Sequence, residues 1–480
     1  MKKILYTASA FLLVLASCTS DDSNFNRDQD RSYDVPAETL LANAQRELTD
    51  QLVTPEVNLN PLRFYTQYWA ATQYPAESRY NLVTRTIADN LWDNLFRDVL
   101  GNLESAKDVI EVNPDLDDAT KQNQIAIIEI IEVYTYQILV DTFGDIPYSQ
   151  SLDVLNVLPA YDDDATIYPQ LITRLDAALT NLNDGEGTFT TGDVIYSGSV
   201  AKWRLFGNSL KVKLGINLSD VNPSLAQSTI ESAVADGVIT DNSDNATLRY
   251  PGSAPFYNPI YAQLVASNRN DFVASESIVN QLNDLDDPRR SAYFELDGTG
   301  VYSGGINGAG NGYFNFSPIA ESLTENNVPG VLFEATEINF YLAEAAARGY
   351  SVNGTIEEYY EAAITTSFEF WGVGDVETYL ANPDVAYATA QGDWKQKIGM
   401  QEWIAFFNRP FESWTAWRRL DVPSLTPAIN AVPASEGQIP VRFTYPIDEQ
   451  TVNNTNWTAA SNAIGGDKLT TRVFWDLAND

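Results

Sequence analysis

The chain has 480 residues, with 29 basic and 65 acidic side chains and a net charge of −36 at pH 7. So acidic a surface repels phosphates and anionic lipid headgroups, which excludes nucleic acid as a partner. The sequence contains no histidine, and this excludes Ser-His-Asp triads, histidine bases and histidine-ligated zinc.

The first 18 residues have the pattern of a lipoprotein signal. Lys2 and Lys3 precede the apolar stretch 4–15, which is too short to span a bilayer. Residues 15–18, with the sequence LASC, fit a lipobox, and Cys18 is the single cysteine of the chain. We therefore expect Cys18 to be lipidated, to anchor the protein in the outer membrane at the cell surface, and to leave no thiol for disulfides or catalysis.

Residues 19–33 are polar and are predicted to form a flexible tether. The acidic pair Asp21 and Asp22 resembles the surface-export signal of Bacteroidetes lipoproteins, although a plain solvated linker has the same composition. The rest of the chain, residues 34–480, is long enough for a large core, and we interpret it as one domain.

Apolar residues spaced by three and four predict a mainly α-helical domain. The predicted helices are 37–52, 87–110, 123–143, 166–182, 199–218, 333–348, 356–370 and 395–407. The pattern is strongest in 123–143, where Gly144 can stop the helix and Pro147 prevents its return. Successive helices of this length suggest tetratricopeptide-like hairpins, but no 34-residue consensus repeat is present.

Residues of about 240–332 form a loop-rich insertion in which helical periodicity fades. Within it, seven glycines alternate with aromatic residues over 297–316. Long loops of this kind are usually functional or disordered, and the aromatic residues argue against disorder. The C-terminal part from Leu425 is also loop-rich, and only Val441 to Tyr445 is a candidate strand.

Two loop regions carry the candidate ligand-binding residues. Aromatic rings pack on the C–H faces of sugars, while amides and guanidinium groups bond to hydroxyls. The first set is Tyr65, Trp69, Gln73, Tyr74, Arg79 and Asn81, and the second is Tyr257, Tyr261, Tyr302, Tyr313 and Phe316. The alternative is that the first region packs helices together and that the second contacts a partner protein.

No cofactor is expected, although acidic clusters offer oxygen ligands for a structural calcium ion. These clusters are Asp115 with Asp117 and Asp118, residues 162–164, and residues 283–287. None of them completes an EF-hand loop, so solvated acidic turns are the simpler interpretation.

Several segments together resemble the SusD/RagB family of nutrient-binding outer-membrane lipoproteins. They include 141–148 (DTFGDIPY), 341–349 (YLAEAAARG), 401–406 (QEWIAF), 412–420 with its WRRL ending, and 439–446 (IPVRFTYP). The segment 74–81 (YPAESRYN) is similar to one branch of the family.

The resemblance implies a scaffold of four tetratricopeptide-like hairpins with long irregular loops that carry the ligand site. It also implies a partner, a SusC-like TonB-dependent outer-membrane transporter. In the family the loop after the first helix contributes to glycan binding, and Trp69 and Asn81 fall in that region. The motifs themselves are interpreted as structural, with an ion pair between Glu344 and Arg348 and buried pairs of Arg418 and Arg419 with Glu412.

The leading functional hypothesis is a non-enzymatic glycan-binding lipoprotein that delivers oligosaccharides to the transporter. A neutral β-glucan such as laminarin is the first candidate ligand, because the net charge disfavours polyanions. Oligopeptides remain an alternative, as does an anionic glycan such as alginate, held by Arg63, Arg79 or Arg85. A glycoside hydrolase and a purely structural lid are the rival classes.

Overall fold

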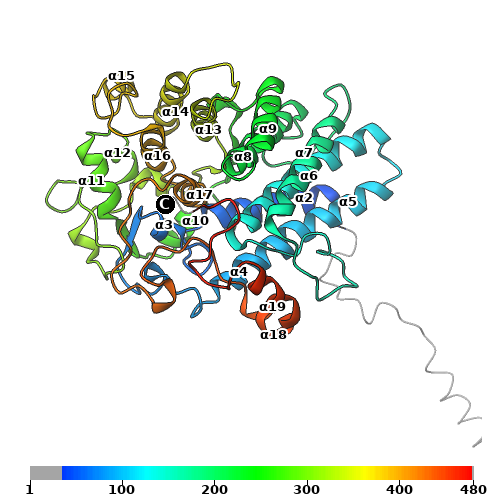
Figure 1. Ribbon diagram of the computed structural model, residues 1–480, viewed down its shortest axis with the longest axis horizontal. Helices are drawn as coiled ribbons and strands as arrows, with labels where there is room; N and C mark the ends of the chain where they lie inside the picture. The colour runs from blue at the N-terminus through cyan, green and yellow to red at the C-terminus, as the bar shows by residue number, and fades with distance from the viewer. Residues whose placement is uncertain (1–34, 478–480) are drawn as a thin grey trace, which may run out of the picture. The chain divides into compact units, whose positions relative to one another are not determined.

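Figure 1 shows the computed structural model, in which residues 35–477 are described. The predicted signal, Cys18 and the tether 19–33 lie outside the described residues. Residues Ala37–Asp480 belong to one compact unit, which is described below.

Four helical hairpins form the scaffold of this unit. In the first, α2 (Ala37–Val53) packs against a continuous rod made of α4 (Ile87–Asp93), the π-helical η3 (Asn94–Leu100) and α5 (Gly101–Val112). The others are α6 (Asp118–Phe143) with α7 (Asp164–Asn181), α8 (Val200–Leu218) with α9 (Pro223–Asp236), and α13 (Ala335–Ala347) with α14 (Ile356–Trp371). The predicted hairpin scaffold is therefore confirmed.

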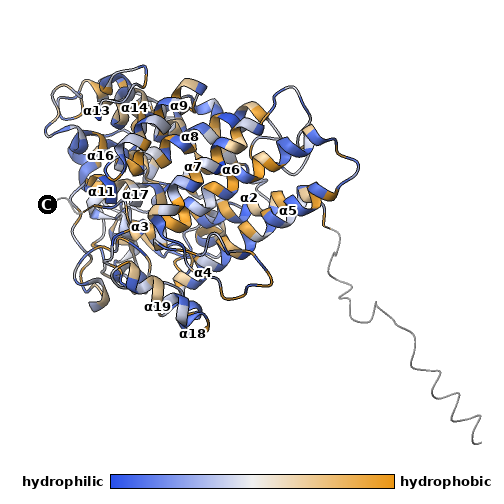
Figure 2. Cartoon of the chain, turned by 45° about the vertical axis from the view of Figure 1, so that its right-hand side comes forward, coloured by the Kyte–Doolittle hydropathy of each residue, from blue (hydrophilic) through white to orange (hydrophobic). Residues whose placement is uncertain are grey.

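Helix α6 lies at the centre of the scaffold. The Asp117 side chain accepts a hydrogen bond from the Thr120 amide at 2.8 Å and caps the start of the helix. At the other end, Gly144 has φ +78° and donates its N–H to the Val140 carbonyl, as the sequence predicted. The helix is apolar on nearly all sides, which suits its burial among α2, α5, α7 and α8 (Figure 2).

Two glycines let α8 approach its neighbours closely. A Cβ atom at Gly207 would lie 2.7 Å from Leu179 of α7, and one at Gly215 would lie 2.6 Å from Ile230 of α9. A larger side chain at either position would force Leu179 or Ile230 to shift.

The remaining elements are short. Strand β1 (Trp69–Ala71) pairs antiparallel with β3 (Phe272–Ala274), and β2 (Ala246–Leu248) pairs with β4 (Gly330–Phe333). The other helices are α3 (Leu62–Tyr65), η2 (Glu77–Arg79), η4 (Asn242–Asp244), α10 (Pro259–Tyr261), η5 (Ala262–Ala266), α11 (Glu276–Asp284), α12 (Arg290–Tyr293), η6 (Tyr313–Asn315), η7 (Glu321–Thr324), α15 (Val376–Leu380), α16 (Trp394–Ala405), α17 (Pro410–Leu420), η8 (Pro433–Ser435), α18 (Ile447–Val452) and α19 (Asn454–Ala463).

The predicted strand at Val441–Tyr445 is wrong. The segment is largely buried, but it begins in a bend and pairs with no strand of residues 35–477. Its Val441 amide bonds to the Leu469 carbonyl and its Phe443 amide to the Thr142 carbonyl. Carbonyl groups of a loop and of a helix end thus take the place of a neighbouring strand. An alternation of apolar and polar residues does not reveal which backbone groups pair with the segment.

The family-like motifs meet in the core and hold it together. Arg418 donates to the carbonyls of Asp141 and Val441 at 2.6 and 2.8 Å. Trp414 Nε1 donates to the Pro440 carbonyl, and Arg442 Nε donates to the Phe143 carbonyl. These contacts join the end of α6, helix α17 and the segment 439–446, so the motifs are structural.

The buried charges pair differently from the prediction. Glu344 and Arg348 form the expected ion pair at 2.9 Å. Glu412, however, pairs with Arg409 and Lys213 instead of Arg418 or Arg419. Six or seven residues along a helix correspond to about 10 Å, which is too far for the predicted contact.

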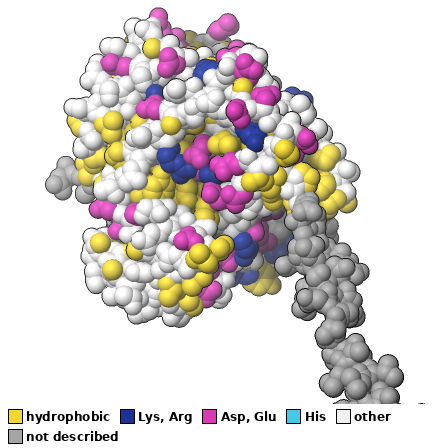
Figure 3. Space-filling model, turned by 90° about the vertical axis from the view of Figure 1, so that its right-hand side faces the viewer, with side chains coloured by type: hydrophobic (Ala, Val, Ile, Leu, Met, Phe, Trp, Pro, Cys, Tyr) yellow, Lys and Arg dark blue, Asp and Glu magenta, His cyan; other side chains and the backbone are white. Residues whose placement is uncertain are grey.

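Several basic side chains are withdrawn into the core, including Arg289, Arg418 and Arg442. A larger number of acidic side chains is buried with them, among them Glu337, Glu344 and Glu402, and acidic side chains still outnumber basic ones on the face in Figure 3. Among residues 35–477, no helix combines the length and apolar composition needed to cross a membrane.

Candidate functional site

The first predicted set of ligand residues divides into buried and accessible members. Tyr65 is fully buried and packs edge-to-face on Tyr80. Trp69 is 1% exposed and lies between Phe272 and the Arg63 guanidinium. Because no ligand reaches either ring in this arrangement, we assign both rings to the support of the loops.

Gln73 and Tyr74 are the accessible members, and Tyr74 is 68% exposed. Both line a small cavity of about 100 Å³ next to β1. Arg79 is half-buried and donates Nε to the Gly308 carbonyl, and it forms no ion pair within residues 35–477. Asn81 instead stabilises its own turn, because its side chain bonds to Thr84.

The second predicted set lies on the surface of the loop-rich region. Tyr257 and Tyr261 form a half-buried ring pair at 4.9 Å, and the Tyr302 ring lies near the Arg290 guanidinium. Tyr313 contacts Phe314, which is 84% exposed. Phe316 is half-buried.

The structure brings the two sets side by side. Asn311 donates both its amide N–H and its side chain to the Ala71 carbonyl, and Arg79 reaches Gly308. Segment 73–79 and the glycine-rich loop 297–316 therefore form one surface, here called the loop face.

The glycines of this loop serve the protein itself. A Cβ at Gly308, where φ is +82°, would lie 2.3 Å from the Ile429 carbonyl oxygen, and one at Gly304 would collide with the Glu276 backbone. A ligand cannot approach the backbone closely at these two glycines, because other chain segments already occupy the space.

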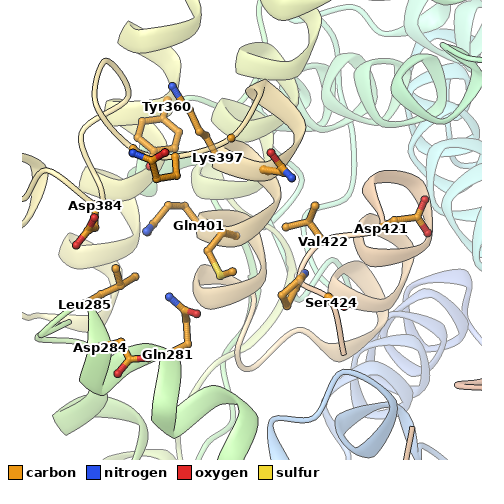
Figure 4. Close-up of a pocket in the computed structure, with 16 residues that line it drawn as sticks. Gln281, Asp284, Leu285, Tyr360, Asp384, Lys397, Gln401, Asp421, Val422 and Ser424 are labelled. Carbon is orange, nitrogen blue, oxygen red and sulfur yellow. The ribbon is translucent and has the colours of Figure 1, made fainter. Parts of the chain in front are cut away.

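A much larger cavity, of about 600 Å³, opens between α11, α16 and the segment after α17 (Figure 4). Its size is typical of small-molecule sites. The lining residues that carry polar groups are Gln281, Asp284, Tyr360, Asp384, Gln391, Gln396, Lys397, Gln401, Asp421 and Ser424. None of the eleven predicted ligand residues belongs to this lining.

The cavity offers many hydrogen-bonding groups. The side chains of Gln281 and Gln391 have no hydrogen-bond partner within the described part of the chain, so both amides are available. Figure 4 shows Gln281 rising from α11 toward α16. At the back, Gln401 accepts from Arg289 and Tyr379, and Lys397 Nζ donates to the Tyr387 carbonyl. Such convergent amides suit a neutral ligand that is rich in hydroxyl or amide groups.

The cavity and the loop face adjoin each other through α11. Ser277, one turn before Gln281, donates to Gln67 and accepts from Asn307 of the glycine-rich loop. The segment from Asp421 to Val432 also runs from the cavity to the loop face, where the Val432 amide bonds to the Arg79 carbonyl. A chain-like ligand could therefore contact both surfaces.

Little in the sequence indicates this cavity. The predicted helix 395–407 corresponds to α16, but its residues were interpreted as structural, and α11 lies in a region predicted as loop. One local pattern marks the edge of the cavity in the sequence. Asp393 and Gln396 form a capping box, which starts α16 next to the exposed Gln391.

The acidic clusters have structural partners. Asp163 caps α7 through the Thr166 amide, Asp162 accepts from Ser149, and Asp287 pairs with Arg289 at 2.7 Å. Within residues 35–477, no group of three or more Cys, Asp or Glu side chains is arranged to hold a metal ion. A bound structural calcium ion stays a prediction that the structure does not test.

Taken together, these observations describe a mainly helical protein whose candidate ligand surfaces lie on loops and short helices beside a hairpin scaffold. A family model described as SusD-like, starch-binding and associating with the outer membrane matches residues 29–446. The chain therefore belongs to the SusD-like family, as its motifs indicated. SusD-like proteins are binding proteins.

Solved structures agree with this assignment. A structure named as a chitin-binding protein is 26% identical with a TM-score of 0.80, and covers 92% of this chain and 100% of its own. A chitin-binding SusD homologue from Flavobacterium johnsoniae is also 26% identical, with a TM-score of 0.79 and coverage of 92% and 99%. A SusD homologue from Bacteroides uniformis is 28% identical, with a TM-score of 0.77 and the same coverage. No curated protein sequence matches the chain.

Proposed function

We propose that this protein captures a neutral oligosaccharide at the cell surface and passes it to a SusC-like TonB-dependent transporter. The observation that carries the proposal is the 600 Å³ cavity, in which the Gln281 and Gln391 amides have no partner within residues 35–477, next to a loop face with exposed rings. Lipidated Cys18 would hold the protein in the outer membrane.

The charge of the chain supports a neutral ligand. Three carboxylates, those of Asp284, Asp384 and Asp421, line the cavity against one cation, Lys397. This balance opposes a uronate or a sulfate. Two relatives are named as chitin-binding, so chitin oligosaccharides are the first ligands to test, with laminarin as the neutral β-glucan alternative.

One observation favours a second candidate, an anionic glycan. Arg79 lies on the loop face without an ion pair in the described chain, and a guanidinium group pairs well with carboxylate or sulfate groups. Binding there would use the loop face alone and would leave the cavity empty.

Native gels that contain a single polysaccharide test the ligand class. The protein without residues 1–18 should be retarded by glycol chitin or laminarin and should migrate normally through alginate. Retardation by alginate alone would transfer the site to Arg79, and retardation by none would favour a peptide ligand. Incubation with the bound glycan should release no new reducing ends; their release would contradict a pure binding function.

A further inference from the structure

The large cavity has an apolar wall beside its free amides. The wall is formed by Leu285 at the end of α11, Met400 of α16, and Val422 and Pro423 after α17. Among the described residues that line the cavity, Tyr360 is the one aromatic residue, but it is 1% exposed and its hydroxyl is bonded to a backbone carbonyl. The cavity therefore offers no accessible ring for stacking on a sugar, and its wall suits a small aliphatic group instead.

Helical spacing places an amide next to the apolar residue on two sides of the cavity. Gln281 and Leu285 are four residues apart at the end of α11, and Gln396 and Met400 are four residues apart on α16. Side chains at this spacing lie on the same face of a helix. Figure 4 shows Gln281 and Leu285 projecting from α11 into the same space. A ligand in the cavity thus meets polar and apolar groups side by side.

Two of the amides are available to bond a ligand. The side chains of Gln281 and Gln391 have no hydrogen-bond partner in residues 35–477. Gln401 is already engaged, because its Oε1 accepts from Arg289 and Tyr379. A glutamine amide presents a carbonyl acceptor and an NH₂ donor, so it matches a ligand group that also carries both.

A ligand group that satisfies these surfaces combines an N–H donor, a carbonyl acceptor and a methyl group. The acetamido group at C2 of an N-acetylglucosamine unit has all three. Resting on the proposed function, we infer that this cavity recognises the acetamido group of a chitin-type oligosaccharide. The Gln281 and Gln391 amides bond to its N–H and carbonyl, and the methyl group packs against Leu285 and Met400.

A glucan fits this arrangement less well. It carries a hydroxyl at C2, which has neither a carbonyl to accept from an amide nor a methyl group to cover the apolar wall. A polar hydroxyl against Leu285 and Met400 loses its bonds to water without replacement. The inference therefore separates chitin oligosaccharides from laminarin, which the charge of the cavity does not.

The carboxylates of the cavity define the main alternative, a deacetylated unit with an ammonium group at C2. Asp284, Asp384 and Asp421 would attract that cation, whereas Lys397 would repel it. The apolar wall opposes the alternative, because an ammonium group packed against it would be desolvated. We therefore assign the acetylated form.

Calorimetric titration with three hexaoses of the same β-1,4 linkage tests the inference on the chain without residues 1–18. Chitohexaose has an acetamido group at C2, cellohexaose a hydroxyl and glucosamine hexaose an amine. Chitohexaose should bind about ten-fold more tightly than either of the others.

The other outcomes separate this inference from the proposed function. Equal affinities for chitohexaose and cellohexaose, or binding of laminarin alone, would overturn acetamido recognition and leave the capture of a neutral glycan intact. Tighter binding of glucosamine hexaose would transfer recognition to the carboxylates. The absence of binding to all three hexaoses and to laminarin would refute both.

Two variants locate the recognition in the cavity. Gln281→Leu removes the amide and keeps much of the shape, and Met400→Gln replaces an apolar contact by an amide. Each should lower the ratio of the chitohexaose affinity to the cellohexaose affinity about five-fold. The control is Gln227→Leu, because Gln227 is exposed on α9 and bonds to Glu231; it should keep the ratio of the unmodified chain. Thermal unfolding shows that each variant is folded, and an unchanged ratio in both test variants would place the acetamido group outside the cavity.

Saturation-transfer difference NMR measures the contact independently of affinity. The acetyl methyl protons of chitohexaose should receive more saturation than its ring protons, because the methyl group lies against the apolar wall. Met400→Gln should reduce the methyl signal relative to the ring signals. Methyl signals no stronger than the ring signals in the unmodified chain would overturn the inference.

Discussion

Replacing Arg418 by Met tests whether the shared motifs form the structural centre of the fold. Arg418 is 1% exposed, and its guanidinium lies 3.6 Å from the Trp414 ring centroid. Its Nη1 is the donor for the Asp141 and Val441 carbonyls. Met keeps most of the volume and removes every donor, so the change isolates the polar contacts.

The expected loss of stability is the balance of two opposing contributions to the free energy of unfolding. Two buried carbonyls without a donor cost about 1–3 kcal/mol each, and the lost cation–π contact costs about 2 kcal/mol. Burial lowers the pKa of Arg418 to about 10. Removing this charge therefore regains about 3 kcal/mol. The hydrogen bonds prevail, and we expect the free energy of unfolding to fall by about 3 kcal/mol.

Urea titration followed by circular dichroism measures this loss. Arg97→Met is the matched control, because the Arg97 side chain is 67% exposed and pairs only with surface carboxylates; it should cost less than about 0.5 kcal/mol. Equal stability of the two variants would refute the reasoning that the motif arginine organises the core.

Three further changes test the site and the packing. Gln281→Ala should lose one hydrogen bond to the glycan and weaken its binding, measured by calorimetry, about 2- to 12-fold. The control Gln227→Ala, on α9, should leave the affinity unchanged. Equal affinities of the two variants would exclude Gln281 from the site. Burial raises the pKa of Glu402 from 4.5 to about 8, so the folded state holds the extra proton and stability falls as pH rises between these values. Glu402→Gln has no group that loses this proton, so its Tm relative to that of the unmodified chain should rise from pH 5 to 8. A Tm difference that stays constant over this range would contradict the raised pKa of Glu402. Gly215→Ala places a methyl group 2.6 Å from Ile230 and should cost about 1–3 kcal/mol in urea titration; unchanged stability would contradict the close packing of α8 on α9.

Helical periodicity predicted the scaffold well, because apolar stripes report directly on packed helices. The predicted 123–143 and 199–218 correspond to α6 and α8 with small shifts at their ends. Helix α11 was missed although Ile278, Val279 and Leu282 have helical spacing, because its nine residues lie within a Gly- and Asn-rich region that was interpreted as loop. The extended segment 441–445 was misassigned because its backbone partners come from distant loops.

The site was less predictable, because aromatic residues mark both cores and ligand surfaces. Tyr65 and Trp69 have the composition of a sugar platform, yet both are buried, while Tyr74 and Arg79 of the same segment are accessible. Gln281 and Gln391 are brought to one cavity from positions more than a hundred residues apart, and no local pattern indicates that juxtaposition.

Calorimetric titration with chitohexaose tests the central claim most directly, using the chain without residues 1–18 and its variant Met400→Trp. Met400 is half-buried on α16 and lines the large cavity, so an indole there would fill much of the space. The account predicts saturable binding by the unmodified chain and an affinity at least ten-fold lower for the variant. Equal affinities would show that the ligand lies outside the cavity, and the absence of binding to both chitohexaose and laminarin would contradict a neutral glycan ligand.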